Sequence, residues 1–137
     1  MNTQDQNGYM LLYRTDEWYN RLSHAELQKL MDQNKAWIET LTAQGKAKPG
    51  RALERRGAIV SGADGRFVTD GPFVESKEAI GGYLVLHVET MDEAIAIAQS
   101  SPGLAYGGSI EVRPVADECP LDVRERELAR EEQLATV

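Results

Sequence analysis

Three stretches of the chain have the residue patterns of β-strands. Residues 8–14 and 82–89 are nearly continuous runs of aliphatic and aromatic side chains. Such runs are typical of strands that are buried on both faces of a sheet. The third stretch, residues 107–115, ends at Pro114 and Val115, where a missing backbone donor costs little. We expect all three to be strands of one sheet.

Two stretches between these strands repeat apolar residues at the three- and four-residue spacing of a helix. Ser23 and Glu26 form the pattern of a capping box at the start of the first stretch, and Gly45 is suited to its end. The second stretch begins at a similar box in residues 90–93 and ends at the Ser-Pro-Gly of residues 101–103. Both are predicted to be helices that pack one face on the sheet.

The segment between the first helix and the second apolar run has turn signals and weaker strand patterns. Residues 46–50 are expected to be a linker, and residues 52–60 a strand with exposed charges. Asp64 and Gly65 are typical of a hairpin turn, after which residues 66–69 return as an edge strand. The segment is therefore predicted to hold a hairpin at the edge of the sheet, against its central strand.

The predicted order of elements is β-α-β(hairpin)-β-α-β, in which the hairpin of residues 52–69 takes the place of one strand. This is the order of the ferredoxin-like fold, an α+β architecture in which an antiparallel sheet carries two helices on one face. The other face has no covering element in this chain, and strands this apolar are not expected to stay exposed. We therefore expect a homodimer, in which a second copy covers that face.

The two ends of the chain differ from the rest in composition. Residues 1–7 are polar and are expected to be disordered. Residues 8–115 are predicted to form one domain, as a chain of 137 residues allows. Residues 116–137 hold seven acids and three arginines, a net charge of −4, and are predicted to be an acidic, helical tail that docks on a partner or on the domain surface.

Composition limits the classes of function. The net charge is −7 and the pI about 4.8, whereas a nucleic-acid surface needs a basic stripe, so no nucleic acid is expected as a partner. No apolar run approaches the 18 residues of a membrane span. Cys119 is the single cysteine and there are two histidines, which argues against a disulfide or a structural metal site. We expect a cytoplasmic protein that uses no cofactor.

Strand parity places a set of polar side chains on the uncovered face of the sheet. The set consists of Tyr83, His87, Glu111 and Arg113, with Arg14 or Tyr13 at the end of the first strand. We predict that these residues line a polar cavity between two subunits that binds a small molecule. In this cavity His87 is the titratable catalytic group, Glu111 orients it, and Arg113 holds an anionic substrate.

The loop between residues 69 and 83 contributes two further candidates. Asp70 opens a strong Asp-Gly-Pro turn signal, and Lys77 lies in a charged stretch that follows. A loop rich in charge and glycine beside a buried strand is a frequent place for function. We predict that Asp70 and Lys77 lie at the rim and close the mouth of the cavity.

Each candidate also has a purely structural interpretation. Glu111 and Arg113 could form an ion pair across a dimer interface, and His87 could serve only as a hydrogen-bonding group there. Asp70 could cap its own turn, and Lys77 could belong to a surface ion pair that contributes little energy.

Several motifs of the chain resemble the DGPF branch of the YCII-related proteins. They are YMLLY at 9–13 with Trp18, Leu22-Ser23 at the start of the first helix, TDGPF at 69–73, the charged residues Glu75, Lys77 and Glu78, GGY at 81–83 and GSIEVRPV at 108–115. The resemblance covers residues 8–115. It implies a dimeric α+β barrel of the ferredoxin-like kind, in agreement with the uncovered sheet face.

The resemblance does not imply one settled reaction. Most DGPF-type proteins have no assigned reaction, and some are encoded beside extracytoplasmic sigma factors in bacterial genomes. The wider YCII-related group is proposed to include enzymes that use a His–Asp pair, with one branch acting as a dehydrochlorinase on chlorinated aromatic intermediates. Related dimeric barrels include muconolactone isomerases and small monooxygenases.

This chain departs from the group at the positions of that pair. By the group's spacing from the end of the first helix, Asn34 stands where the histidine is expected, and Ala43 stands near the place of the aspartate. Neither side chain can act as an acid or base, so the pair's chemistry is not expected here. Asn34 also falls on the apolar stripe of the predicted helix, where it is either hydrogen-bonded at the helix–sheet edge or directed into a pocket.

Two functions remain open from the sequence. The first is a small-molecule-binding homodimer with cofactor-independent acid–base activity of the lyase or isomerase kind. The second is a non-enzymatic regulatory or interaction module linked to sigma-factor systems, with residues 116–137 as its contact. We favour the first on the precedent of the fold.

Overall fold

The computed structural model describes residues 8–136 with the exception of residues 71–79, and describes only the backbone of Asp70. Its main sheet is built from β1 (Tyr9–Arg14), β2 (Ala47–Ala52), β5 (Ile80–Leu86) and β6 (Ser109–Pro114). The spatial order is β2-β5-β1-β6, and every neighbouring pair is antiparallel. The two central strands, β1 and β5, are the two apolar runs of the sequence.

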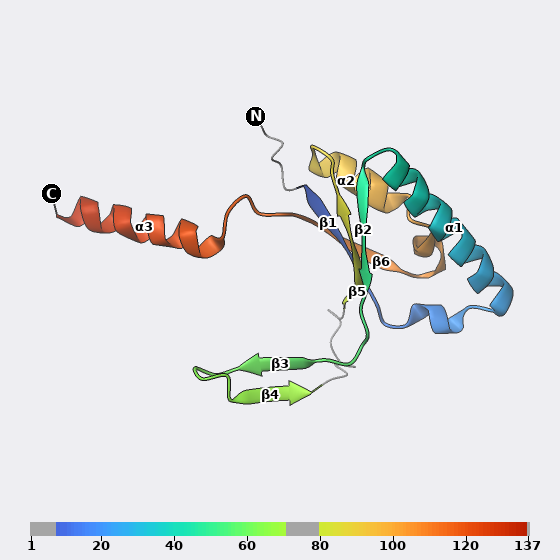
Figure 1. The fold of residues 1–137 in the computed structure, drawn as a ribbon, viewed down its shortest axis with the longest axis horizontal. Coiled ribbons are helices and arrows are strands. Elements are labelled where there is room, and N and C mark those ends of the chain that lie inside the picture. The colour runs from blue at the N-terminus through green and yellow to red at the C-terminus, as the bar shows by residue number, and fades with distance from the viewer. Residues whose placement is uncertain (1–7, 71–79, 137) are drawn as a thin grey trace.

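The connections between these strands give the ferredoxin-like α+β fold. Helix α1 (His24–Ala43) joins β1 to β2, and α2 (Met91–Gln99) joins β5 to β6. In each of these two units, one strand of the other unit lies between the two joined strands, which is the split β-α-β arrangement. Both helices cover the same face of the sheet (Figure 1). The predicted fold class is confirmed.

The sequence signals at both ends of α1 act as predicted. The amide of Glu26 donates to the Ser23 hydroxyl over 3.1 Å, and the Ser23 amide donates to the Glu26 carboxylate over 2.9 Å, which completes the capping box. At the other end Gly45 has a φ of 74°, a left-handed conformation that favours glycine. The Lys46 amide then donates to the Leu41 carbonyl over 2.9 Å.

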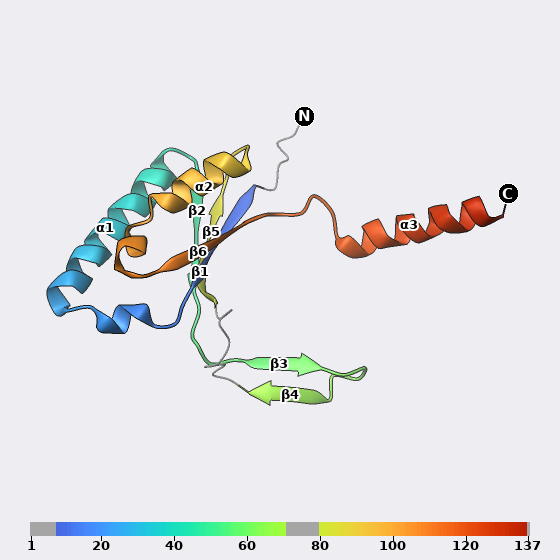
Figure 2. The same ribbon diagram turned by 180° about the vertical axis from the view of Figure 1, so that it is seen from behind.

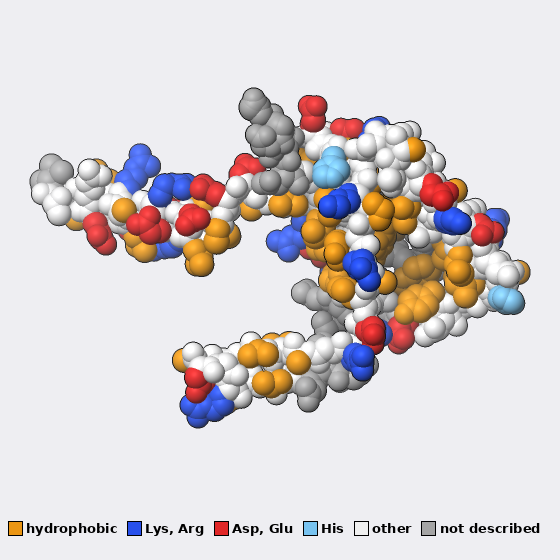
Figure 3. Space-filling view, viewed as in Figure 1, with side chains coloured by type: hydrophobic (Ala, Val, Ile, Leu, Met, Phe, Trp, Pro, Cys, Tyr) orange, Lys and Arg blue, Asp and Glu red, His pale blue; other side chains and the backbone are white. Residues whose placement is uncertain are grey.

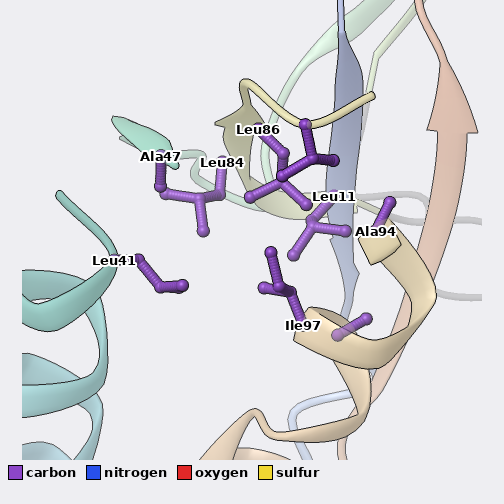
Figure 4. Close-up of a cluster of buried hydrophobic side chains, with 9 residues drawn as sticks. Leu11, Leu41, Ala47, Leu84, Leu86, Ala94 and Ile97 are labelled. Carbon is purple, nitrogen blue, oxygen red and sulfur yellow. The ribbon is translucent and has the colours of Figure 1, made fainter. Parts of the chain in front are cut away.

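The hydrophobic core lies between the two helices and the sheet (Figure 4). Leu11, Leu84 and Leu86 are fully buried, and the sheet register sets Leu11 directly opposite Leu84. Each such leucine contributes about 1.5–3 kcal/mol through burial. Leu41 of α1 and Ile97 of α2 close the core from the helix side. Strand parity thus predicted correctly which residues of β5 face the helices.

Strand β2 was not predicted, because its residues were expected to be a linker. Its sequence, Ala-Lys-Pro-Gly-Arg-Ala, contains Pro49 and Gly50 and is poor in strand-forming residues. The strand forms because it is the edge of the sheet, where proline needs no donor on its outer side. A Cβ at Gly50 would also collide with the backbone and ring of Tyr83 on β5, so this pairing requires glycine. Of residues 52–60, which were predicted to form one strand, Ala52 ends β2 and residues 58–60 belong to the next strand.

The hairpin is present but does not join the edge of the main sheet as predicted. Strands β3 (Ala58–Ser61) and β4 (Phe67–Asp70) form a separate two-stranded sheet around a turn in which Gly62 and Gly65 have positive φ. Its large apolar side chains are 55–63% exposed: Ile59, Val60, Phe67 and Val68. Val60 lies opposite Val68, whereas Ile59 lies opposite Thr69, so both faces of this hairpin arm carry apolar groups.

The acidic tail forms a helix, α3 (Pro120–Ala135), as predicted. Its start is held by two hydrogen bonds of 2.7 and 2.8 Å from the Arg126 guanidinium to the Glu118 carboxylate. No residue of α3 is buried. The helix and the hairpin arm both extend from the side of the sheet that lies away from α1 and α2 (Figures 1 and 2).

The face of the sheet opposite the helices is open in the single chain. The register places Leu12 between Tyr83 and Glu111, and Met10 between Val85 and Arg113. Leu12, Met10 and Val85 are half-buried. Apolar atoms gather on this side of the body and on the hairpin arm that faces it (Figure 3). We refer to this surface as the open sheet face.

Candidate functional site

A cavity of about 540 Å³ lies between the middle of α1 and the end of the sheet where β1 finishes and β5 begins. The 3₁₀ helices η1 (Trp18–Arg21) and η2 (Pro102–Tyr106) close its sides, and the end of β2 forms its rim. Cavities that bind small molecules typically have volumes of several hundred Å³. We call this space the α1 cavity.

Aromatic side chains form much of the wall of the α1 cavity. They are Tyr13, Trp18, Tyr19 and Tyr83. The rings of Trp18 and Tyr19 meet edge to face, with centroids 5.7 Å apart and an angle of 84° between their planes. Trp18 packs on the backbone of Gly103 and Gly108, where an added Cβ would lie 3.3 and 3.0 Å from its ring. Gly103 and Gly108 therefore allow the Trp18 ring to pack closely on the backbone after α2.

Asn34 lines the α1 cavity from α1 and is half-buried. Its side chain forms no hydrogen bond with any residue in the described part of the chain. This arrangement favours the pocket over the hydrogen-bonded edge as the interpretation of this asparagine. The amide offers two donors and one acceptor to a bound molecule.

The ring of Tyr13 also lines the cavity, but its hydroxyl is buried and has no hydrogen-bond partner within residues 8–70 and 80–136. Burial disfavours the phenolate and raises the pKa of Tyr13 to about 12. The hydroxyl therefore stays protonated at neutral pH and can act as a donor, not as a base. A buried, unpaired hydroxyl costs about 1–3 kcal/mol, and such groups are uncommon away from functional sites.

The charged residues in the described wall are all arginines: Arg14, Arg51 and Arg55. Arg55 pairs with Glu17 over 3.5 Å, and Arg14 pairs with Glu111 over 3.2 Å. Arg51 is exposed and pairs with no carboxylate of the described chain. The wall thus has an excess of positive charge in a protein whose net charge is −7.

The structure separates the residues that the sequence suggested as one site. Arg14 and Tyr83 line the α1 cavity, whereas Glu111 and Arg113 lie on the open sheet face, with a separation of 3.8 Å between a guanidinium nitrogen and a carboxylate oxygen. Arg14 joins the two surfaces through its contact with Glu111. Tyr83, which lines the cavity, is also in the register row of Glu111.

His87 lies apart from these residues. It follows the end of β5, its side chain is exposed, and its amide donates to the Lys46 carbonyl over 2.8 Å. Tyr83 is in the row of Leu12 and Glu111, and His87 comes four residues later, about 13 Å farther along the strand. Within one chain the expected contact between His87 and Glu111 is therefore not formed. Their catalytic roles stay predictions.

The structure does not describe the side chains of Asp70 and Lys77, the two residues predicted at the rim of the cavity. Asp70 is the last residue of β4, and only its backbone is described. Lys77 lies outside the described residues. Across the described ranges, His, Cys, Asp and Glu side chains form no cluster that could hold a metal ion. None of the described helices is long and apolar enough to cross a membrane.

Sequence reasoning named Tyr13, Arg14, Asn34 and Tyr83 as possible pocket residues but missed most of the α1 cavity. The cavity is formed by the ends of strands and by two 3₁₀ helices, whose residues are widely separated in the sequence. Two signals were available, the polar residue on an apolar helical stripe and the glycines that precede the last strand. Neither signal indicates by itself which elements face each other.

Comparison with known proteins gives a consistent assignment. The family model described as YCII-related domain matches residues 9–118. An uncharacterised protein of Rhizobium meliloti (strain 1021), R00369, is 30% identical over 111 residues, which are 78% of this chain and 90% of that protein.

A solved structure with a similar arrangement is that of 5-chloro-2-hydroxyhydroquinone dehydrochlorinase (TftG) from Burkholderia phenoliruptrix AC1100, in complex with 2,5-dihydroxybenzoquinone. It is 20% identical, and the match covers 80% of this chain and 95% of that chain with a TM-score of 0.41. A TM-score of this size does not allow a ligand to be transferred from one protein to the other.

Proposed function

This chain belongs to the YCII-related domain family, and we propose that it is a homodimer that binds a small molecule in the α1 cavity. The observation that carries the proposal is the cavity of about 540 Å³, whose wall holds the Asn34 amide, which has no hydrogen-bond partner among the described residues. A space of this size with few polar groups in an aromatic wall is the usual form of a small-molecule site.

The chemistry of the wall limits the reactions that this site could support. The described wall contains no imidazole, carboxylate or thiol, which are the groups that most often act as a general base. It does offer donors, the Asn34 amide and the guanidinium groups, which can stabilise a developing oxyanion. A lyase- or isomerase-like activity in this cavity would depend on such stabilisation and on a base from the substrate, from water or from a second copy of the chain.

The homodimer is supported by the open sheet face. Leu12 and Val85 are partly exposed at its centre, and the hairpin arm beside it has apolar groups on both faces. Apolar surfaces of this kind are rarely left in contact with water. A second copy related by a twofold axis would bury both, because each copy presents the same surface.

The proposed binding can be tested by a crystallographic fragment screen of the full-length protein, repeated with an occluded cavity. Ala52 is exposed at the rim of the α1 cavity, so Ala52→Trp should fill the mouth. Ala36 is exposed on α1 and does not line the cavity, so Ala36→Trp is the matched control. We expect fragments in the α1 cavity of the unsubstituted protein and of the control, and none in the Ala52→Trp variant. Fragments that occupy only the open sheet face would contradict the proposal.

A second candidate function, an interaction module, is supported by α3. The helix lies apart from the domain, and Leu121 and Leu128 are 77% and 41% exposed, seven residues apart on one side of it. An exposed stripe of this kind can dock in the groove of a partner. Removal of residues 116–137 should abolish the binding of a specific partner if this function holds, and retained binding would exclude it.

A further inference from the structure

The α1 cavity combines a positively charged rim with walls rich in aromatic and aliphatic residues, although the protein as a whole is acidic. Three arginines and no carboxylate are present in its described wall, against a net charge of −7 for the chain. Most of the other wall residues are aromatic or aliphatic, and Trp18 packs closely on Gly103 and Gly108.

The three arginines differ in how far their charge is already compensated. Arg14 and Arg55 each pair with an acid outside the wall, Glu111 at 3.2 Å and Glu17 at 3.5 Å. These pairs hold two guanidinium groups in place and compensate their charge. No carboxylate within the described residues pairs with Arg51, and Arg51 lies at the rim of the cavity. Its five N–H donors are suited to a carboxylate.

Asn34 adds a neutral donor to this arrangement. Its amide lines the cavity and forms no hydrogen bond with another described side chain. A wall that offers donors and cations, but no described carboxylate, selects a molecule that carries acceptors and negative charge.

We propose that the ligand of the α1 cavity is a flat organic carboxylate, whose anionic group binds Arg51 at the rim while its apolar body lies against Trp18. This inference rests on the proposed function and specifies its ligand class. The same wall disfavours cations, because nothing described in it would compensate their charge, and a fully polar anion would leave the aromatic surface unused.

The test compares two probes that share one ring system and differ in charge. 1-Naphthoate carries a carboxylate, and 1-naphthamide is its neutral counterpart of nearly the same shape. Isothermal titration calorimetry of the full-length protein at low salt should show naphthoate binding about tenfold more tightly, as expected for one charge-assisted contact. The preference should fall as salt is raised, because Arg51 is exposed.

Variants of single arginines locate the contact. Arg51→Gln should reduce the preference for naphthoate to less than about twofold and leave naphthamide binding unchanged. Arg66→Gln is the matched control, since Arg66 is exposed on the hairpin arm and pairs there with Asp64. The preference should persist in this control. A loss of preference in Arg113→Gln with none in Arg51→Gln would overturn the inference and move the anion site to the open sheet face.

The outcomes separate this inference from the proposed function. Equal binding of the two probes would contradict the preference for a carboxylate. It would not affect the proposal that the α1 cavity binds a small molecule. If neither probe binds while neutral fragments occupy the cavity in crystals, the carboxylate inference is wrong and the proposed function still holds. If neither the probes nor any fragment enters the cavity, both fail.

Discussion

The guanidinium of Arg14 donates a hydrogen bond of 3.2 Å to the carboxylate of Glu111, from the end of β1 to the middle of β6. Arg14 lines the α1 cavity, whereas Glu111 lies on the open sheet face. The contact therefore joins the proposed ligand site to the proposed dimer interface. It gives the two surfaces a direct physical connection through one pair of side chains.

The energy of this pair can be measured by a double-mutant cycle with Arg14→Gln and Glu111→Gln. Their side chains are 28% and 37% exposed, so in the single chain we expect a coupling energy of about 0.5–1 kcal/mol. Urea unfolding of the four proteins at low concentration provides the measurement. Additive effects would show that the pair makes no net contribution. A coupling that increases with protein concentration would indicate that dimerisation buries the pair.

A charge at the centre of the open sheet face should separate the proposed dimer. Leu12 lies between Tyr83 and Glu111 in the register, so Leu12→Glu places two like charges side by side in each copy. We expect the molar mass from light scattering to fall from that of two chains to that of one. Thr40→Glu, on the exposed side of α1, should leave the mass unchanged. A Leu12→Glu protein that keeps the mass of two chains would place the interface elsewhere.

Tyr13 should make the protein less stable at high pH. Its pKa is raised from 10.0 to about 12 by burial, so between these values the unfolded chain loses the proton while the folded chain retains it. Below pH 10 the ionisation of Tyr13 leaves the unfolding free energy unchanged. Near pH 12 it lowers the unfolding free energy by about 2 to 3 kcal/mol.

Urea unfolding of the unsubstituted protein and of Tyr13→Phe, carried out from pH 8 to pH 12, tests this dependence. Between pH 8 and pH 12 the unsubstituted protein should lose about 2 to 3 kcal/mol of unfolding free energy relative to Tyr13→Phe. Tyr19→Phe is the control, because Tyr19 is 40% exposed. A difference that does not change with pH would show that the Tyr13 hydroxyl ionises normally.

The glycine at position 108 should be required for the aromatic wall. A Cβ there would lie 3.0 Å from the Trp18 ring and 3.1 Å from the Gly103 carbonyl oxygen. Gly108→Ala is therefore expected to cost about 1–3 kcal/mol and to shift the fluorescence of Trp18. Ala105→Ser, at an exposed position of the neighbouring η2, should change neither property. An unchanged unfolding curve for Gly108→Ala would mean that Trp18 can move away without cost.

Removal of the tail should leave the domain stable. None of the residues of α3 is buried, and its ion pairs join residues of the tail to one another, as with Arg126 and Glu118. Truncation after Ala116 should change the melting temperature at low protein concentration by less than about 2 °C. Differential scanning calorimetry of both chains is the measurement. A larger decrease would show that α3 docks on a folded surface, of its own chain or of a second copy.

The sequence by itself determined the elements whose signals are local. The capping box at Ser23 and the glycine at position 45 delimit α1, and the alternation in residues 83–88 predicts which side chains of β5 enter the core. These signals depend on contacts within a few residues or on the two-residue period of a strand, so they can be read along the chain. Together with the order of elements they were sufficient for the ferredoxin-like fold.

Only the tertiary structure decided features that depend on which distant segments meet. Pro49 lies in a strand because the sheet edge accepts it, and His87 lies apart from Glu111 because the register sets them about four rows apart. The α1 cavity exists because α1, two 3₁₀ helices and the ends of four strands leave a space that their side chains do not fill. Such a space has no periodicity of its own, so Asn34 indicated a pocket without indicating its walls.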